Sequence, residues 1–396
     1  MSRYRLVPTS DQVVGLLEHC RHARYVWNLA VEQHAHWQGG RVSAPGFAEQ
    51  CRQLTEARAE FAWLRAGSAT VQQQALRDFA QAVRNFFGGT HGRPGWRKAG
   101  VREGFRQVAV KPEHVRRVNR RHGQLWVPKV GWVRFRWSRT VPEGVKSYRI
   151  GRDQAGRRHV AFAAVPTPVP APRNGELVGV DRGVAVSVAL STEELFHAPT
   201  LTPGEKERLL RLRRRLARAK RGSNRRRKVK TAIARMTARA KDRRKDWVEK
   251  ISAELARRFD RIRVEDLVIR SMTRSARGTA KQPGGQVRQK AGLNRAILAN
   301  AWGMLVARLE CKAPGRVEKI PAAYTSQTCA ACGHCAPENR KSQAVFRCTA
   351  CGHQANADVN AAINIAAGRT VTARGDLGIS RSVKREPRPA TSSPVA

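Results

Sequence analysis

Four cysteines near the C-terminal end of the sequence form two pairs of the same kind. Cys329-Ala-Ala-Cys332-Gly-His is followed by Cys348-Thr-Ala-Cys351-Gly-His, with 15 residues between Cys332 and Cys348. Two thiolates from each pair can share one tetrahedral ion, so the spacing predicts a ribbon that binds one structural zinc. Two disulfides or ordinary buried cysteines are the alternative, and the repetition of the whole pattern argues against them.

Three acidic residues stand at the edges of predicted elements: Asp181, Glu265 and Asp358. The first ends an apolar run, the second lies near the end of a predicted strand, and the third begins a helix-like segment. The chain has only 30 acidic residues against 76 Lys and Arg, so their positions are informative. Three converging carboxylates suit hydrolysis of a phosphodiester with two Mg²⁺ ions roughly 3.5–4 Å apart. Hard oxygen ligands favour Mg²⁺ or Mn²⁺ over Zn²⁺.

Each carboxylate also has an ordinary structural interpretation. Asp181 precedes Arg-Gly and could shape a hairpin turn, Glu265 could pair with one of many arginines, and Asp358 could cap a helix. Asp266 would point to the opposite face of its strand from Glu265, so we leave it out of the site. The residues by themselves leave both interpretations open.

The charge of the chain indicates its partners. A formal net charge of +46 over 396 residues repels itself unless a polyanion screens it. Nucleic acid is the natural partner, bound through several segments rather than one patch. A membrane surface is the weaker alternative, because no basic amphipathic helix flanks a hydrophobic anchor.

The remaining cysteines and the chain start indicate a compartment. Cys335 lies beside the ribbon and is a possible alternative ligand, while Cys20, Cys51 and Cys311 are scattered. This is metal binding in a reducing compartment rather than a disulfide framework. Neither a secretory signal nor an apolar run of membrane-spanning length is visible. We expect a cytoplasmic protein.

The elements of the first half are a helical part and a β-rich part. We expect a strand at residues 4–7, a helix capped by Thr9 or Ser10, and a second helix from Ser68 to the glycines at 88–89. Short β-type runs follow at 108–110, 125–127, 133–137, 148–150 and 159–162. In the run 133–137 arginines alternate with apolar residues, which predicts a sheet or small β-barrel with one cationic face.

A proline-rich linker at 166–172 predicts a domain boundary. The expected order beyond it is a strand at 177–181, a tight turn at 182–183, a strand at 184–190, two basic helices broken at 222–224, a strand at 261–266, a mobile loop at 271–289, a helix at 293–311, a strand at 316–320, the zinc insertion and a helix at 358–367. The two basic helices keep apolar residues at helical spacing, so we expect a packed hairpin with one cationic side.

Several segments closely resemble the TnpB family, the OrfB-type proteins of bacterial insertion sequences, which are similar to compact type V CRISPR nucleases. They are Val178-Gly-Val-Asp181-Arg-Gly183, Val264-Glu265-Asp-Leu267, Tyr324-Thr-Ser-Gln-Thr-Cys329-x-x-Cys332-Gly-His and Ala357-Asp358-Val-Asn360-Ala-Ala-Ile-Asn-Ile365. Weaker similarity lies in Ala23-Arg-Tyr-Val-Trp-Asn-Leu-Ala30 and Gly92-Arg-Pro-Gly-Trp-Arg-Lys98. The resemblance extends to about Gly368.

The resemblance implies an α/β multidomain protein. Its expected parts are a wedge-like β-barrel at 1–8 and 91–170, an inserted helical recognition lobe at 9–90, an RNase H-like nuclease domain of the RuvC type at 174–328 and 353–368, a zinc ribbon at 329–352 and a disordered basic tail at 369–396. The implied activity is RNA-guided cleavage of DNA, with Asp181, Glu265 and Asp358 as metal-binding catalytic carboxylates.

The implied partners are a guide RNA and double-stranded target DNA, bound by a monomer in the prokaryotic cytoplasm near the nucleoid. Two departures from the family pattern stand out: Arg182 occupies a position where Leu is frequent, and Cys335 is an additional cysteine. Neither changes the three carboxylates. The alternatives are a nuclease-inactive nucleic-acid-binding regulator and a transposase that joins strands.

Overall fold

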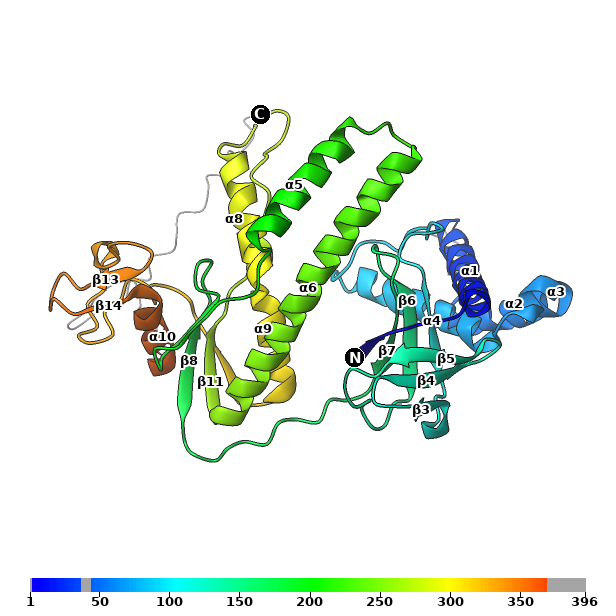
Figure 1. Cartoon of the computed structure of the whole chain (residues 1–396), viewed down its shortest axis with the longest axis horizontal. Coiled ribbons are helices and arrows are strands. Elements are labelled where there is room, and N and C mark those ends of the chain that lie inside the picture. The colour runs from blue at the N-terminus through cyan, green and yellow to red at the C-terminus, as the bar shows by residue number, and fades with distance from the viewer. Residues whose placement is uncertain (1, 37–43, 369–396) are drawn as a thin grey trace, which may run out of the picture. The chain divides into compact units, whose positions relative to one another are not determined.

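The computed structural model describes residues 2–36 and 44–368 (Figure 1). The expected disordered tail at 369–396 lies outside them. The chain divides into two compact units. The first comprises Met1–Pro166 and Gly204–Ala238, and the second comprises Thr167–Pro203 and Arg239–Ala396. The first division falls beside the proline-rich segment, and the last falls inside helix α6 (Asn224–Arg258).

The β-rich part of the first unit consists of two antiparallel sheets. One has the order β1 (Ser2–Arg5), β7 (Arg158–Ala163), β6 (Ser147–Arg152) and β2 (Gly104–Val108), and the other has the order β3 (Val115–Arg117), β4 (His122–Val127) and β5 (Gly131–Arg136). A bridge between Leu6 and Phe135 joins the sheets edge to edge. The rings of Tyr4 and Phe162 each pack against Phe135, at centroid distances of 5.5 and 5.8 Å, and form the centre of the core.

The alternation predicted for residues 133–137 is confirmed. Val133 and Phe135 are buried, whereas Arg134 and Arg136 are exposed. The predicted strand at 108–110 is wrong in position, because β2 ends at Val108 and Ala109 adopts a left-handed backbone with φ 55°. A short 3₁₀ helix, η1 (Pro112–His114), leads into β3.

Four helices accompany these sheets: α1 (Ser10–Ala35), α2 (Phe47–Glu60), α3 (Ala62–Ala66) and α4 (Ala69–Phe87). Thr9 caps α1, since its side chain accepts from Gln12 N while the Gln12 side chain accepts from Thr9 N. Ser68 caps α4 and Gly88 ends it, as predicted. Helices α1 and α4 pack through a perpendicular ring contact between Trp27 and Phe79.

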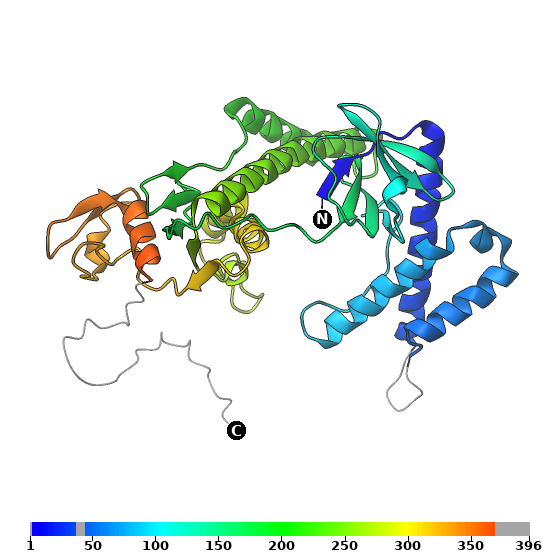
Figure 2. The same ribbon diagram turned by 90° about the horizontal axis from the view of Figure 1, so that it is seen from below.

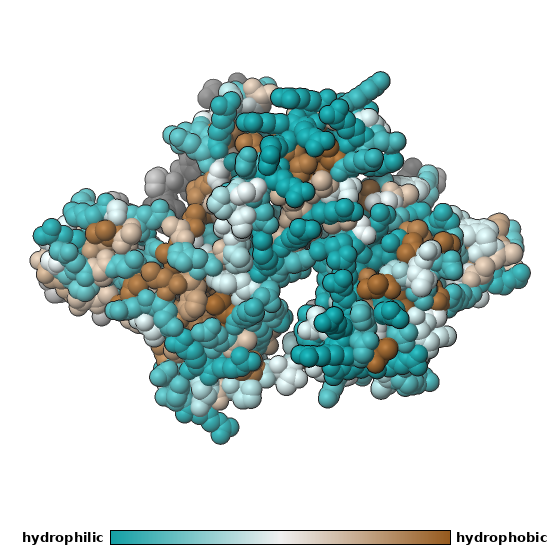
Figure 3. Space-filling view, in the orientation of Figure 1, coloured by the Kyte–Doolittle hydropathy of each residue, from teal (hydrophilic) through white to brown (hydrophobic). Residues whose placement is uncertain are grey.

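The helical hairpin begins with α5 (Pro203–Arg218) and turns into α6. Arg226 closes the turn by donating to the carbonyls of Leu216 and Ala219, at 2.7 and 2.9 Å. Leu209, Leu212 and Val229 are buried on its apolar side, so the predicted basic hairpin with a packed face is confirmed. Figure 3 shows hydrophilic side chains gathered over this hairpin. The exposed cations of α5 are Lys206, Arg208, Arg211, Arg213, Arg214, Arg215 and Arg218.

The second unit is built on a five-stranded mixed sheet. Its order is β10 (Leu195–Phe196), β9 (Val188–Leu190), β8 (Leu177–Asp181), β11 (Arg261–Glu265) and β12 (Val317–Ile320). The strands β8, β11 and β12 are parallel, and β9 and β10 are antiparallel. Parallel strands need both faces covered, and helices lie on both.

The C-terminal half of α6 and helix α9 (Trp302–Lys312) cover one face of this sheet. Val248 and Leu255 of α6 and Leu309 of α9 share a core with Val178 and Val180 of β8. Helix α10 (Ala357–Ala367) packs on the other face, against Gly179. In Figure 2, which views the molecule from below, α10 is the orange-red helix beside the green strands of this sheet.

The structure corrects three expectations in this unit. The predicted strand at 184–190 spans only Val188–Leu190, so a tight turn at Arg182-Gly183 is wrong: residues 182–187 form a longer connection. The predicted helix at 293–311 is two helices, α8 (Val287–Asn300) and α9, because Ala301 has a left-handed φ of 58°. The segment 271–289 contains the end of α7 (Ile269–Met272), the start of α8 and a bridge between Gly278 and Pro283.

The ribbon lies between β12 and α10. It contains a 3₁₀ helix, η2 (Pro337–Asn339), and a hairpin of β13 (Val345–Arg347) and β14 (Gln354–Asn356). In the described part of the chain no helix has the length and apolar character to cross a membrane.

Candidate functional site

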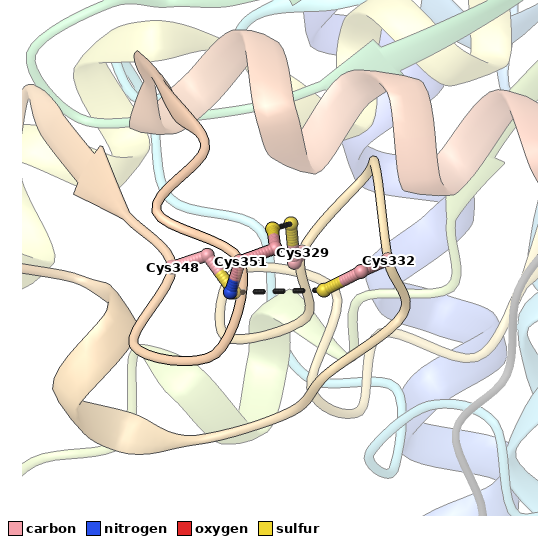
Figure 4. Close-up of side chains that lie close together, drawn as sticks. All are labelled: Cys329, Cys332, Cys348 and Cys351. Atoms are coloured by element: carbon pink, nitrogen blue, oxygen red, sulfur yellow. Dashed lines mark hydrogen bonds between the residues drawn. The ribbon is translucent and has the colours of Figure 1, made fainter.

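The four cysteines of the two pairs meet at one point (Figure 4). The sulfur atoms of Cys329 and Cys351 are 3.8 Å apart, those of Cys332 and Cys348 are 3.6 Å apart, and all four lie within 4.8 Å of one another. A tetrahedron with Zn–S bonds of about 2.3 Å has edges of about 3.8 Å. The four sulfurs therefore fit a single zinc ion. Cys335 is not part of this group.

The two knuckles that present the cysteines are built alike. Gly333 N donates to Cys329 O and Gly352 N donates to Cys348 O, and both glycines have left-handed φ angles, of 77° and 72°. A residue with a Cβ is strained there, which explains the glycine after each second cysteine. Burial acts to raise the pKa of the Cys348 thiol, but the backbone N–H groups of Cys351 and Ala350 outweigh it and lower that pKa to about 6.

Asp181 and Glu265 occupy the ends of neighbouring parallel strands. Asp181 is the last residue of β8 and Glu265 is the last residue of β11, with Val180 paired to Val264 in the position before. The carboxyl ends of parallel strands lie at the same sheet edge, so both side chains stand at that edge.

Asp358 reaches the same edge from α10. A Cβ atom added to Gly179 would overlap the backbone of Ala362 and Ala366, so only glycine lets α10 approach β8 this closely. Asp358 lies in the first turn of α10, and its Oδ2 is 3.8 Å from the position of a Cβ built on Gly183. We call Asp181, Glu265 and Asp358 the carboxylate site.

Burial raises the pKa of all three acids of the carboxylate site, and repulsion adds to the effect at Asp181. Burial, followed by the charges of Glu265 and Asp358, raises the pKa of Asp181 to about 7. Burial also raises the pKa of Glu265, opposed by the Thr325 hydroxyl and Arg182. The pKa of Asp358 is raised by burial as well, opposed by Arg340. Such a donor set is suited to divalent cations, whose charge would relieve the repulsion.

The carboxylate oxygens are less tightly gathered than the sulfurs. Within residues 2–36 and 44–368, the cysteines alone form a group of three or more His, Cys, Asp or Glu whose ligand atoms all lie within 4.8 Å of one another. A site for two ions has to spread its ligands over a longer span than a site for one.

The structure also tests the ordinary interpretations of the three acids. Asn356 caps α10, accepting from the N–H groups of Asp358 and Val359, so Asp358 is not the cap. Asp181 precedes a six-residue connection rather than a tight turn. Arg182 donates to the backbone carbonyl of Glu265, while the Glu265 carboxylate accepts from Thr325. Asp266 is exposed, away from the buried Glu265.

Sequence reasoning missed two side chains that contact the carboxylate site. Arg340, which lies between the two knuckles, donates from Nη2 to Asp358 Oδ1 at 3.1 Å. Thr325 donates from Oγ1 to Glu265 Oε1 at 2.8 Å. The only available signal was proximity to the motifs, since Thr325 lies four residues before Cys329 and an arginine in so basic a chain is inconspicuous.

Three family models match the sequence. Residues 302–365 match a model described as "Cas12f1-like, TNB domain", residues 159–276 match the OrfB_IS605 model, described as "Probable transposase", and residues 2–40 match one described as "Helix-turn-helix domain". Residues 2–36 of the last match fold as strand β1 and the single helix α1.

Two curated proteins are similar over nearly their whole length. The "Putative RNA-guided DNA endonuclease InsQ" of Escherichia coli (strain K12) is 35% identical over 396 residues, covering 97% of this chain and 96% of the relative. A "Putative RNA-guided DNA endonuclease" of Streptomyces pristinaespiralis is 32% identical over 410 residues, covering 98% and 96%.

A solved structure shares the fold at low identity. A protein chain in a cryo-EM structure of a Cas12f1–sgRNA–target DNA complex superposes with a TM-score of 0.55 at 14% identity, over 89% of this chain and 82% of that one. The α/β architecture is thus found in both.

Proposed function

This chain belongs to the TnpB family, the OrfB-type proteins of insertion sequences, and from that premise we propose that it is an RNA-guided DNA endonuclease. Two relatives that are 35% and 32% identical over nearly the full length carry that activity in their names. The observation that carries the proposal for this chain is the approach of Asp181, Glu265 and Asp358 from three elements to one sheet edge.

We assign the three carboxylates as ligands of two magnesium ions in a RuvC-type site. Magnesium would lower the pKa of an attacking water and stabilise the leaving 3′ oxygen of a DNA phosphodiester. The charges of both other acids act on Asp181, so a bound cation would favour its ionised form. Arg340 holds the Asp358 carboxylate and brings a positive charge to the edge where a phosphate would lie.

Both units offer features that support nucleic-acid binding. The exposed arginines of α5 and the outward Arg134 and Arg136 of β5 provide cationic surfaces in the first unit. Arg116 stacks on the exposed side of this sheet, 4.0 Å from the ring centroid of Trp132. Guide pairing would read the target sequence, and these surfaces would hold the backbones of guide RNA and target DNA.

The parts of the proposed enzyme follow the family. Residues 174–328 and 353–368 make the RNase H-like nuclease domain, which the mixed sheet with helices on both faces supports. Residues 329–352 make the zinc ribbon, 1–8 and 91–170 the wedge-like barrel, and 9–90 the recognition lobe. Since guide RNA and genomic DNA are the proposed partners, we infer that the protein acts in the prokaryotic cytoplasm.

The test is cleavage by the purified ribonucleoprotein. RNA that copurifies with the protein is sequenced, and a plasmid matching the guide, with a randomised flank, is incubated with Mg²⁺. We expect double-strand cuts beside one short flanking motif, with Asp181→Ala abolishing the cuts while RNA and DNA binding persist. Unchanged behaviour of Asp181→Ala would support a non-cleaving regulator instead. Joined DNA products on a gel would support a transposase.

A further inference from the structure

The segment 325–330, which leads into the first zinc knuckle and contains its first cysteine, touches the carboxylate site through Thr325. Thr325 is 3% exposed, and its hydroxyl donates to Glu265 Oε1 at 2.8 Å across 60 residues of sequence. Because a hydroxyl that donates to one carboxylate oxygen restricts rotation of the group, Glu265 is held with its other oxygen available. The same hydroxyl lies 3.3 Å from the carbonyl of Ala322, so its own position is also fixed.

Two asparagines of α10 hydrogen-bond to the backbone of the segment 325–330. Asn360 and Asn364 are fully buried at 0% exposure. Asn364 Nδ2 donates to the carbonyls of Thr325 and Thr328, at 3.0 and 2.7 Å. Asn360 Nδ2 donates to Thr328 O at 2.8 Å, and its Oδ1 accepts from Ala330 N at 2.9 Å. A buried amide without partners is costly, so these bonds keep the segment in register with α10.

The segment also contains the first zinc ligand. Cys329 lies between Thr328 and Ala330, both of which are bonded to Asn360. Further along the same ribbon, Arg340 donates from Nη2 to Asp358 Oδ1 at 3.1 Å. Two of the three carboxylates thus accept hydrogen bonds from residues on either side of the first knuckle: Glu265 from Thr325, four residues before Cys329, and Asp358 from Arg340, within the ribbon.

We propose that Thr325 is a positioning residue for Glu265, and that zinc in the ribbon raises the divalent-cation affinity of the carboxylate site through the segment 325–330. This inference rests on the proposed function, in which Glu265 is a cation ligand. Zinc would join the two knuckles, and the joined knuckles would keep the segment 325–330 hydrogen-bonded to α10. In that position Thr325 donates to the Glu265 carboxylate. Loss of zinc releases Thr325 from Glu265, so cation binding weakens although every carboxylate is still present.

The first experiment compares Thr325→Val with Thr325→Ser. Valine keeps the size of threonine but lacks the hydroxyl, whereas serine keeps the hydroxyl and lacks the methyl group. Mn²⁺ binding to the full-length, RNA-free, zinc-loaded protein is measured by electron paramagnetic resonance. Removal of one hydrogen bond to a charged group should weaken Mn²⁺ binding about tenfold in Thr325→Val. The Mn²⁺ affinity of Thr325→Ser should stay within about threefold of that of the parent, because the hydrogen bond to the Glu265 carboxylate is retained.

The second experiment is a double-mutant cycle between zinc and Thr325. Cys348→Ser should remove the zinc, measured by metal content, and weaken Mn²⁺ binding. Thr325→Val should add little further loss in the Cys348→Ser background, because the two changes act through one contact. Asn364→Ala gives a second route if Cys348→Ser does not fold, since it loosens the segment while all four cysteines remain. We expect it to retain zinc and to weaken Mn²⁺ binding.

The outcomes separate this inference from the proposed function. If the parent itself cuts no guide-matched DNA, the proposed function fails. If the parent cuts DNA and Glu265→Gln binds Mn²⁺ and cuts like it, Glu265 is not a ligand and the positioning role of Thr325 fails with it. If Glu265→Gln loses both activities while Thr325→Val matches Thr325→Ser, only the positioning role is overturned. Fully additive losses in the cycle, or unchanged Mn²⁺ binding in Asn364→Ala, would overturn the coupling to zinc.

Discussion

The second unit contains two candidate metal sites that are built in opposite ways. The cysteine cluster takes all its ligands from 23 consecutive residues, Cys329 to Cys351, and its sulfurs lie within 4.8 Å of one another. The carboxylate site takes three ligands from residues separated by up to 177 positions, on two strands and a helix. A local site depends on short turns, whereas a dispersed site depends on the packing of the whole unit.

The two sites also differ in how they affect the stability of the folded protein. Thiolates bind the ion that holds their loops together, so the cysteine cluster adds to stability when it is loaded. The carboxylates are brought together by packing, and burial, followed by the charges of Glu265 and Asp358, raises the pKa of Asp181 to about 7. Removal of a ligand should therefore destabilise the first site and stabilise the metal-free form of the second.

The largest effect is expected from loss of a zinc ligand. Cys348→Ser should lose the ion and unfold the ribbon, since structural zinc contributes about 10–16 kcal/mol in small zinc domains. DNA cleavage should fall with it, because Arg340 and Thr325 are no longer held. Zinc content, hydrogen exchange over residues 329–352 and cleavage rate report the three changes. Cys335→Ser, in the same ribbon but outside the cluster, is the matched control; equal losses in both variants would contradict the four-cysteine site.

Loss of the close approach between β8 and α10 should come next. In Gly179→Ala the new methyl group meets the backbone of Ala362 and Ala366, which cannot move as a flexible side chain would. We expect destabilisation by about 1–3 kcal/mol from overpacking, together with displacement of Asp358 and loss of cleavage. Thermal unfolding and Mg²⁺-dependent cleavage measure both. Gly204→Ala, where nothing lies near the added Cβ, should leave both unchanged.

Removal of a charge from the carboxylate site should stabilise the magnesium-free protein, whereas loss of a zinc ligand should destabilise it. Asp181 has a folded-state pKa of about 7, whereas the ordinary value is about 3.9. A group with a raised folded pKa favours the folded state fully below pH ~4 and loses that contribution as pH rises towards ~7. Asp181→Asn cannot ionise, so we expect it to stabilise the magnesium-free protein by about 2–4 kcal/mol at pH ~8.

Thermal unfolding of zinc-loaded, magnesium-free protein between pH ~4 and ~8 checks this expectation. The extra stability of Asp181→Asn over the parent should decrease as the pH is lowered. Added Mg²⁺ should also reduce it, because the parent alone binds the ions well. The exposed neighbour change Asp266→Asn is the control. A parent that is more stable than Asp181→Asn at pH ~8 without Mg²⁺ would contradict a raised pKa of Asp181 in the folded protein.

The smallest effect is expected where the two sites meet. Arg340→Gln removes the partner of Asp358 and should slow cleavage about tenfold, the loss expected for one charge-assisted hydrogen bond. Its zinc content should remain that of the parent. Arg347→Gln changes the same charge on the exposed strand β13 of the ribbon and should slow cleavage by less than twofold. Equal slowing would assign the effect to net charge rather than to the contact with Asp358.

The sequence predicted the local features well because their causes are local. The cysteine spacing, the helix cap predicted at Thr9 or Ser10 and the alternation at residues 133–137 each depend on neighbours in the chain, and Thr9 is the cap. The strand end at Asp181 was predicted from an apolar run and is confirmed, whereas the strand predicted at 261–266 ends one residue earlier, at Glu265.

The failures occur where the backbone or a distant partner decides the outcome. Ala109 and Ala301 adopt left-handed conformations that alanine rarely takes, so β2 ends earlier and one expected helix becomes two. The connection at 182–187 is long because Arg182 reaches the carbonyl of Glu265 and Gly183 O accepts from Trp302 Nε1. Thr325 and Arg340 lie far in sequence from the acids they contact, so no pattern could pair them.

The placement of Arg340 inside the ribbon limits how this protein could be miniaturised. Trimming residues 335–347 to make a shorter genome-editing tool would remove a cation that touches Asp358, even though the four clustered cysteines, the three acids of the carboxylate site and the five-stranded sheet would remain. A functional short version would need a replacement guanidinium delivered from another element, such as the first turn of α10. The ribbon is thus a poor choice for deletion, and the exposed turns of the first unit are better sites for engineering.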